Sequence, residues 1–195
     1  SATTHSAPTI TTPLLARIFI PFACGYFISY LFRTINAVIS PKLTQELGLD
    51  ATSLGLLTSA YFLAFALFQF PLGVLLDRYG PRRVQAGLLV VAASGARIFG
   101  LSHSLTGLLA GRALIGLGVS GCLMAAFKAF TQWFPAHKLP AMNGYVLASG
   151  GLGALTATIP VEAALRFTDW HTLFIVLAVI TLGIAALVFF VYPER

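Results

Sequence analysis

The sequence predicts an all-α integral membrane protein with six transmembrane helices. Two observations lead to this prediction. First, 57% of the 195 residues are hydrophobic and only 9% are charged, whereas about a quarter of the residues of an ordinary soluble domain are charged. Second, the chain contains six apolar stretches, each near the roughly 20 residues that a helix needs to cross a bilayer core. The composition therefore indicates lipid as the surrounding solvent.

The apolar stretches define the expected spans and what lies outside them. We expect spans at about residues 16–39, 53–76, 84–102, 107–133, 141–164 and 172–192. Residues 1–15 form a polar, cytoplasmic tail rich in Ser and Thr, and residues 16–195 form the six-helix bundle. The tail lacks the basic region and apolar core of a signal peptide. Cys24 and Cys122 lie in unrelated apolar stretches, so we interpret both as small buried hydrophobic residues.

The distribution of basic residues predicts how the spans are oriented. If the turn at residues 77–83 is cytoplasmic, most of those at the ends of the spans or between them collect on that side: Arg17, Arg78, Arg82, Arg83, Lys138 and Arg195. Lys42 and Arg166 fall on the other side. The positive-inside rule then places both termini in the cytoplasm, and we expect the inner (plasma) membrane of a bacterium. Because topology accounts for the net charge of +6, the lipid bilayer is an expected partner and nucleic acid is not.

Four basic residues fall within the expected spans, namely Arg33, Arg97, Arg112 and Lys128. A charge at the centre of a membrane helix costs about 2.5–3.5 kcal/mol on insertion scales, so such residues are rare and mark functional sites. Glu162 is the one acid within or at the end of a span; it either pairs with Arg97 or reaches an interface separately. The interior should therefore be electropositive, which favours an anionic ligand.

Polar and aromatic residues of the first span recur at steps of three and four. Tyr26, Ser29, Tyr30, Arg33 and Asn36 therefore lie along one stripe of a helix. A polar stripe on a membrane helix is typical of a surface that faces a cavity. We expect Tyr26, Tyr30, Arg33 and Asn36 to contact a solute there. The alternative for Arg33 is that its guanidinium extends to the membrane surface.

Two polar residues of other spans are further candidates for contact with the solute. Gln69 in the second span either hydrogen-bonds the solute or joins two helices. Lys128 near the inner end of the fourth span either contacts the solute or extends toward the cytoplasm. Arg112 precedes Lys128 by sixteen residues, about 160° around an ideal helix. We therefore expect that Arg112 and Lys128 do not both face one central site.

The turn between the second and third spans reads GVLLDRYGPRRV. Gly73 permits close contact between helices, Gly80 suits a tight turn with positive φ, and Pro81 suits the first position of the next helix. The pattern resembles the signature loop of the major facilitator superfamily, on the residues Gly73, Asp77, Arg78, Gly80, Arg82 and Arg83. The resemblance implies that Asp77 engages the other half of a transporter and helps to hold one of its alternating conformations.

The fourth span carries a second match to the same family. Arg112, Gly116 and Gly118 stand at the spacing of its Arg-x-x-x-Gly-x-Gly pattern, although Ile115 replaces a commonly polar position. The resemblance links this arginine to coupling or gating, and Arg112, Gly116 and Glu162 are our candidates for coupling. Residues 149–153 lack the Gly-Pro signature of the drug-antiporter branches, which makes drug export less favoured.

The first span adds a more specific resemblance. Tyr30, Arg33 and Asn36 are similar to the first-helix motif of organic-anion and organophosphate carriers in this superfamily. The resemblance implies that Arg33 binds the anionic group of the solute. Many proton-coupled members carry an Asp directly before this arginine, whereas this chain has Phe32. Proton coupling at that position is therefore not expected.

The resemblance implies half of a transporter with twelve spans, each half being a 3+3 inverted repeat with the solute site between the halves. The other half is expected in the same longer chain or in a second copy. We expect a secondary transporter that moves a small organic or phosphorylated anion by alternating access. The alternatives are a drug or metabolite efflux protein and a half-size receptor or assembly subunit without transport. No catalytic, metal or cofactor site is expected, because no such motif is present.

Overall fold

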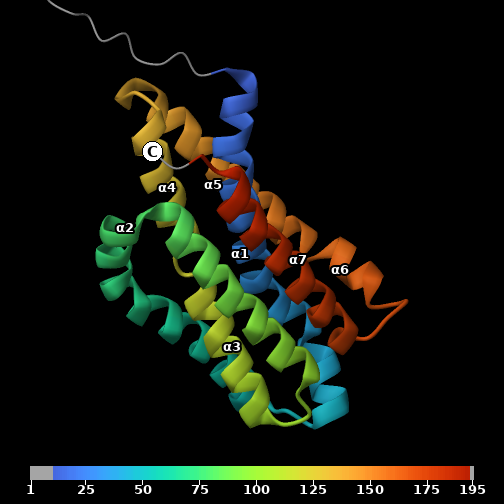
Figure 1. The fold of residues 1–195 in the computed structure, drawn as a ribbon. Helices are drawn as coiled ribbons and strands as arrows, with labels where there is room; N and C mark the ends of the chain where they lie inside the picture. The colour runs from blue at the N-terminus through green and yellow to red at the C-terminus, as the bar shows by residue number, and fades with distance from the viewer. Residues whose placement is uncertain (1–10, 194–195) are drawn as a thin grey trace, which may run out of the picture.

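The computed structural model of the chain describes residues 11–193, and it is helical without strands over that range (Figure 1). Residues 1–10 of the predicted tail, together with Arg195, lie outside the described residues. The elements are α1 (Thr12–Leu47), α2 (Ala51–Leu101), α3 (Leu105–Val119), α4 (Cys122–Trp133), the 3₁₀ turn η1 (Ala136–Lys138), α5 (Leu139–Thr156), α6 (Ile159–Ala164) and α7 (Trp170–Val191).

Within residues 11–193, five helical regions are long and apolar enough to cross a membrane. They are Thr12–Leu47, Ala51–Leu101, Leu105–Trp133, Ala136–Ala164 and Trp170–Val191. The all-α membrane class predicted from the sequence is therefore confirmed. The second and third predicted spans both fall on α2, while the fourth is divided between α3 and α4 and the fifth between α5 and α6.

The 51 residues of α2 do not form one straight rod. A straight helix of that length would measure about 76 Å, more than twice the roughly 30 Å of a hydrocarbon core. The helix instead folds back at Gly80, whose φ of 83° and ψ of 164° are not helical (Figure 1). The positive φ predicted for Gly80 is therefore confirmed. We call residues 51–79 the first arm of α2 and residues 81–101 the second arm.

Glycines of α3 allow both arms of α2 to pack closely against it. A Cβ at Gly116 would overlap the backbone carbonyl of Tyr61 on the first arm of α2. A Cβ at Gly118 would overlap the backbone of Ala92, and one at Gly111 would lie 2.8 Å from the Cβ of Phe99, both on the second arm. Small residues thus hold the hairpin of α2 against α3, because lipid supplies no hydrophobic drive for helices to associate.

Several helices end differently from their predicted spans. The first helix continues to Leu47, so most of the polar segment 41–51 is helical, and Gly48 ends it with φ of 65°. The carboxylates of Asp50 and Asp169 cap α2 and α7 by accepting hydrogen bonds of 2.8 Å from the N–H groups of Ser53 and Thr172. Such caps satisfy donors that a helix start leaves free.

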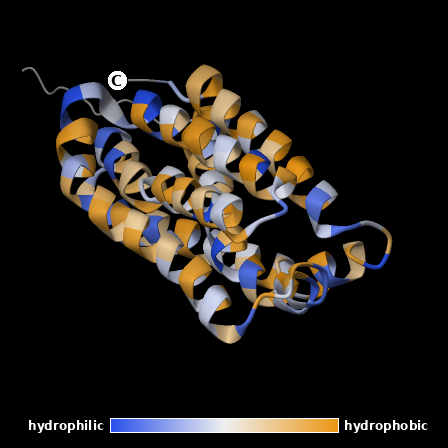
Figure 2. Ribbon diagram, turned by 90° about the horizontal axis from the view of Figure 1, so that it is seen from below, coloured by the Kyte–Doolittle hydropathy of each residue, from blue (hydrophilic) through white to orange (hydrophobic). Residues whose placement is uncertain are grey.

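Hydrophobic residues occur along every long helix (Figure 2), and many large ones are exposed on the outside of the bundle. Phe70, Ile159 and Phe190 are each at least 76% exposed, while Trp170 and Phe174 are fully buried. Large apolar side chains on the outer surface of a protein are unfavourable in water and favourable in lipid. The distribution therefore fits an integral membrane protein.

Candidate solute site and the Asp77–Lys128 ion pair

Arg33 lies in the middle of α1 beside three aromatic rings. Its guanidinium carbon is 4.5 Å from the ring centre of Tyr30, 5.2 Å from that of Phe65 and 5.8 Å from that of Phe62. The side chain is half-buried, and its buried Nε has no hydrogen-bond partner. No ion pair between Arg33 and an acid is present in residues 11–193. We call Arg33, Tyr30, Phe62 and Phe65 the Arg33 cluster.

Two helices form the Arg33 cluster, and a third lies against it. Arg33 and Tyr30 are three residues apart on α1, so they share one face, and both phenylalanines come from the first arm of α2. The ring of Tyr26 meets that of Tyr30 edge-on at 5.1 Å. Gly150 of α5 lies against both tyrosines, since a Cβ there would be 2.9 Å from Tyr30 Cδ2. The cluster therefore borders α1, α2 and α5.

The electrostatics of the Arg33 cluster favour an anion. Aromatic faces attract a cation by about 0.5–1 kcal/mol each at exposed sites, but they do not neutralise its charge. A planar guanidinium can hold a carboxylate, phosphate or sulfonate oxygen pair through two parallel hydrogen bonds. Arg33 retains that capacity because no acid in the described residues engages it.

Arg112 lies behind the Arg33 cluster. It is 1% exposed, its Nη1 donates a 2.9 Å hydrogen bond to the carbonyl oxygen of Phe32, and its guanidinium carbon is 4.6 Å from the ring centre of Tyr61. Gly116, one turn later on α3, packs on the backbone of the same tyrosine. The predicted coupling residues Arg112 and Gly116 thus join α3 to α1 and to the first arm of α2.

Two other predicted solute contacts form hydrogen bonds between helices. The amide nitrogen of Asn36 donates to Thr58 Oγ1 at 3.1 Å, and its buried Oδ1 has no partner. The amide nitrogen of Gln69 donates to the carbonyl oxygen of Ser120 at 2.9 Å, at the break between α3 and α4. Of these two side chains, that of Asn36 has a buried carbonyl oxygen without a hydrogen-bond partner.

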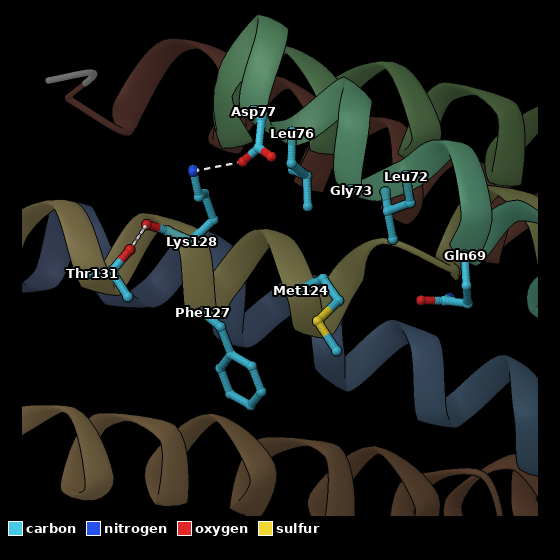
Figure 3. Close-up of a pocket in the computed structure, with 9 residues that line it drawn as sticks. All are labelled: Gln69, Leu72, Gly73, Leu76, Asp77, Met124, Phe127, Lys128 and Thr131. Atoms are coloured by element: carbon cyan, nitrogen blue, oxygen red, sulfur yellow. Dashed lines mark hydrogen bonds and ion pairs between the residues drawn. The ribbon is translucent and has the colours of Figure 1, made fainter.

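Lys128 forms an ion pair with Asp77 rather than joining the Arg33 cluster. The Nζ–Oδ1 distance is 2.9 Å, and the two side chains are 37% and 76% exposed. Figure 3 shows them pointing toward each other across the space between the first arm of α2 and α4. They border a pocket of about 390 Å³, lined by Gln69, Leu72, Gly73, Leu76, Asp77, Met124, Phe127, Lys128 and Thr131.

The Asp77–Lys128 pair and the Arg33 cluster lie at different depths of the bundle. Phe130, two residues after Lys128, stacks on Phe19 of α1 with ring centres 6.0 Å apart. Arg33 follows Phe19 by fourteen residues, which is about 20 Å along a helix. The structure therefore brings Arg33, Tyr30 and Tyr26 together and places Lys128 near the end of the bundle where α1 begins.

The remaining motif residues surround the turn of α2. Arg78 and Arg83 are exposed, and the guanidinium carbon of Arg82 is 4.9 Å from the ring centre of Phe189 on α7. A Cβ at Gly73 would meet no atom within 4 Å, so its expected close helix contact is not made within residues 11–193. Glu162 is exposed on α6. It forms no ion pair with Arg97 in this part of the chain.

Sequence reasoning did not identify three residues that matter here. Tyr61, Phe62 and Phe65 of the first arm of α2 provide the rings around Arg33 and Arg112. Tyr61 and Phe65 are four positions apart, which places them on one helical face. This spacing was visible in the sequence. Which helix that face meets depends on contacts between distant segments.

A comparison with known protein families identifies the family to which this chain belongs. The sequence profile of the Major Facilitator Superfamily matches residues 22–195. The chain belongs to the major facilitator superfamily. Two crystal structures of a bacterial homologue of the human lysosomal transporter Spinster, both inward-facing, have TM-scores of 0.83 and 0.84 to this chain at 18% and 17% identity. The matched regions include 94% and 95% of this superfamily member and 45% of each Spinster homologue chain. The fold is therefore shared.

Several named transport proteins are similar to this superfamily member over most of its length. A probable sulfoacetate transporter of Cupriavidus necator is 29% identical over 87% of it. A hexuronate transporter of Bacillus subtilis is 29% identical over 86%, and an efflux pump of Aspergillus niger is 29% identical over 85%. These matches cover 39%, 40% and 31% of the respective relatives. The chain thus spans two fifths or less of the length of these relatives.

Proposed function

We propose that this chain is the N-terminal half of a secondary transporter for small organic anions, in which Arg33 binds the anionic group. The observation that carries the proposal is the Arg33 cluster, a half-buried cation with aromatic neighbours and no acid partner in the described residues. Sulfoacetate and hexuronate, named for two relatives, are both organic anions, which supports this solute class. Tyr26, Tyr30 and Asn36 complete the proposed contact surface on α1.

The proposed mechanism is alternating access between two six-helix halves. The chain would cross the inner membrane six times, once in α1, once in each arm of α2, once in α3–α4, once in α5–α6 and once in α7, with both termini in the cytoplasm. The second half would come from the same longer chain or a second copy. It would face the Arg33 cluster and contact the region of Asp77. The Asp77–Lys128 ion pair would then hold this carboxylate within the first half when the halves separate there.

The arrangement around Arg33 supports a different task for each of the predicted site residues. Arg112 and Gly116 position the Arg33 cluster through Phe32 and Tyr61. Gln69 sits between the cluster and the Asp77–Lys128 pair, where its hydrogen bond to Ser120 stabilises the break in the fourth span. Glu162 is the remaining candidate for coupling, because Phe32 offers no titratable group beside Arg33.

The test is uptake by the complete transporter reconstituted in vesicles. Labelled hexuronate and sulfoacetate are the probes, and Arg33→Gln and Arg33→Lys are the variants. We expect Arg33→Gln to abolish uptake and Arg33→Lys to retain a small part of it, since an ammonium lacks the planar pair of donors. Arg97→Gln is the matched control, because Arg97 is exposed in the second arm of α2. Normal uptake by Arg33→Gln at equal protein content would remove Arg33 from the site.

A second candidate, efflux, is favoured by the similarity to the Aspergillus niger efflux pump. The same vesicles distinguish the two directions when solute is loaded inside and a gradient is imposed outward. Export of an apolar cation without transport of anions would replace the first proposal. Absence of transport of every solute by correctly inserted protein would favour the receptor or assembly role.

A further inference from the structure

Two open apolar grooves on the outside of the bundle meet at Arg83. The larger, of about 440 Å³, runs between the second arm of α2 and α7 and is lined by Arg83, Ala86, Gly87, Val90, Leu182, Ala185, Ala186, Phe189 and Phe190. The smaller, of about 260 Å³, runs between the two arms of α2 and is lined by Leu75, Tyr79, Arg83, Val84, Gly87 and Leu88. Both grooves share Arg83 and Gly87.

Small residues keep these grooves open. A Cβ at Gly87 would meet no atom within 4 Å, so the glycine lies in open space where the two grooves join. Ala86 and Ala185 are buried beneath the surface of the larger groove, and their methyl groups leave room above them. The second arm of α2 and α7 run side by side there (Figure 1).

Positive charge is concentrated at the end where the grooves converge. Gly80 interrupts the helix, so Arg82 and Arg83 occupy the first turn of a new helix that starts at Pro81. A helix start carries a partial positive charge that normally favours acids, and here two arginines add to it. The nearest acid in sequence, Asp77, is engaged by Lys128 at 2.9 Å. Arg83 forms no ion pair in residues 11–193.

We infer that Arg83 and the two grooves bind one anionic phospholipid with two acyl chains. The phosphate would lie on the Arg83 guanidinium and the start of the second arm, and one acyl chain would occupy each groove on either side of Gly87. Charge complementarity selects an anionic headgroup, because basic residues next to a membrane attract anionic lipids. The pair of apolar grooves selects a two-chain lipid over a soluble phosphate, which has no apolar part to fill them.

The test uses native mass spectrometry of the complete transporter with phosphatidylglycerol, phosphatidylcholine of the same acyl chains, and inorganic phosphate. We expect the parent protein to bind phosphatidylglycerol with a stoichiometry of one in preference to the other two. Arg83→Gln should weaken that binding about fivefold, the effect of one basic residue at an anionic surface. Gly87→Leu should weaken it while leaving the charge unchanged, because its side chain fills the junction of the grooves.

The control variant is Arg97→Gln, which removes a charge from the same arm of α2 but does not line either groove. It should bind phosphatidylglycerol as the parent does, and thermal unfolding verifies that all three variants are folded. Equal binding of the two phospholipids would overturn the inference. So would parent-like binding by both Arg83→Gln and Gly87→Leu, binding of inorganic phosphate in place of lipid, or a second protein copy covering the grooves.

Discussion

The guanidinium of Arg112 donates a 2.9 Å hydrogen bond to the carbonyl oxygen of Phe32, the residue directly before Arg33. The same guanidinium lies 4.6 Å from the ring centre of Tyr61, next to Phe62 of the Arg33 cluster. One buried cation therefore contacts both helices that form the cluster. Because Arg112 is almost fully buried, we propose that it supports Arg33 and does not itself contact the solute.

On the proposed function, Arg112→Lys should reduce the affinity of the complete transporter for its anion. The ammonium of lysine lacks the planar surface that stacks on Tyr61 while bonding to the carbonyl of Phe32. Loss of a hydrogen bond from a charged group is worth about 1.5–3 kcal/mol, so we expect a rise in the uptake KM of at least about tenfold. The KM is measured in reconstituted vesicles, with Arg97→Gln as the control. An unchanged KM would show that Arg33 is positioned without Arg112.

Gly80→Ala should destabilise the protein by straining the turn of α2. The φ of 83° with ψ of 164° lies in a region that only glycine occupies readily, and a residue held there costs of order 1–3 kcal/mol. The midpoint of thermal unfolding in detergent should fall accordingly. Gly55→Ala is the matched control on the same helix, because a Cβ at Gly55 meets nothing within 4 Å and alanine favours helix. Equal thermal unfolding midpoints for Gly80→Ala and Gly55→Ala would contradict the strain expected at position 80.

The sequence predicts the helices and the turn better than it predicts the contacts between helices. Apolar length identifies each helical region, and the glycine of the signature loop identifies the position of the turn. Membrane helices are apolar on nearly every side, so their hydrophobic pattern does not reveal which faces meet. The pairing of Lys128 with Asp77, 51 residues away, and of Arg112 with Phe32, 80 residues away, therefore required the folded chain.

The Arg33 stripe was predictable for a different reason. Residues three and four positions apart share a helical face whatever the rest of the chain does, so Tyr30 and Arg33 lie together as the spacing requires. The rings of Phe62 and Phe65 come from another helix. Local spacing thus gives half of the cluster, and packing between α1 and α2 gives the other half.

Breaking the Asp77–Lys128 pair should change stability only slightly. Both side chains are exposed to a considerable extent, and ion pairs of that kind contribute about 0.2–1 kcal/mol. A double-mutant cycle with Asp77→Asn and Lys128→Met, read by thermal unfolding, should give a coupling energy in that range that falls at high salt. A coupling well above it, or one insensitive to salt, would mean that the pair is shielded from solvent. A small energy would suit the role proposed for this pair, a contact that opens and closes as the two halves move.

The cap of α7 should make the stability of the protein depend on pH in the acidic range. The hydrogen bonds from Thr172 to Asp169 hold the pKa of this carboxyl below its ordinary value of 3.8. A lowered pKa means that the cap stabilises the folded state fully above the unfolded pKa, and that this contribution disappears as the pH falls through the folded pKa. Thermal unfolding between about pH 3 and 6 measures it.

Two substitutions at this cap distinguish its charge from its hydrogen bond. Asp169→Asn keeps an oxygen that accepts from the N–H of Thr172, so it should remain close to the parent near neutral pH but lose the part of the pH dependence that Asp169 supplies. Asp169→Ala removes the acceptor and should lower the unfolding midpoint at every pH above about 4. If Asp169→Ala and the parent unfold at the same temperature near pH 6, the start of α7 is held by its buried neighbours Trp170 and Phe174 instead of by its cap.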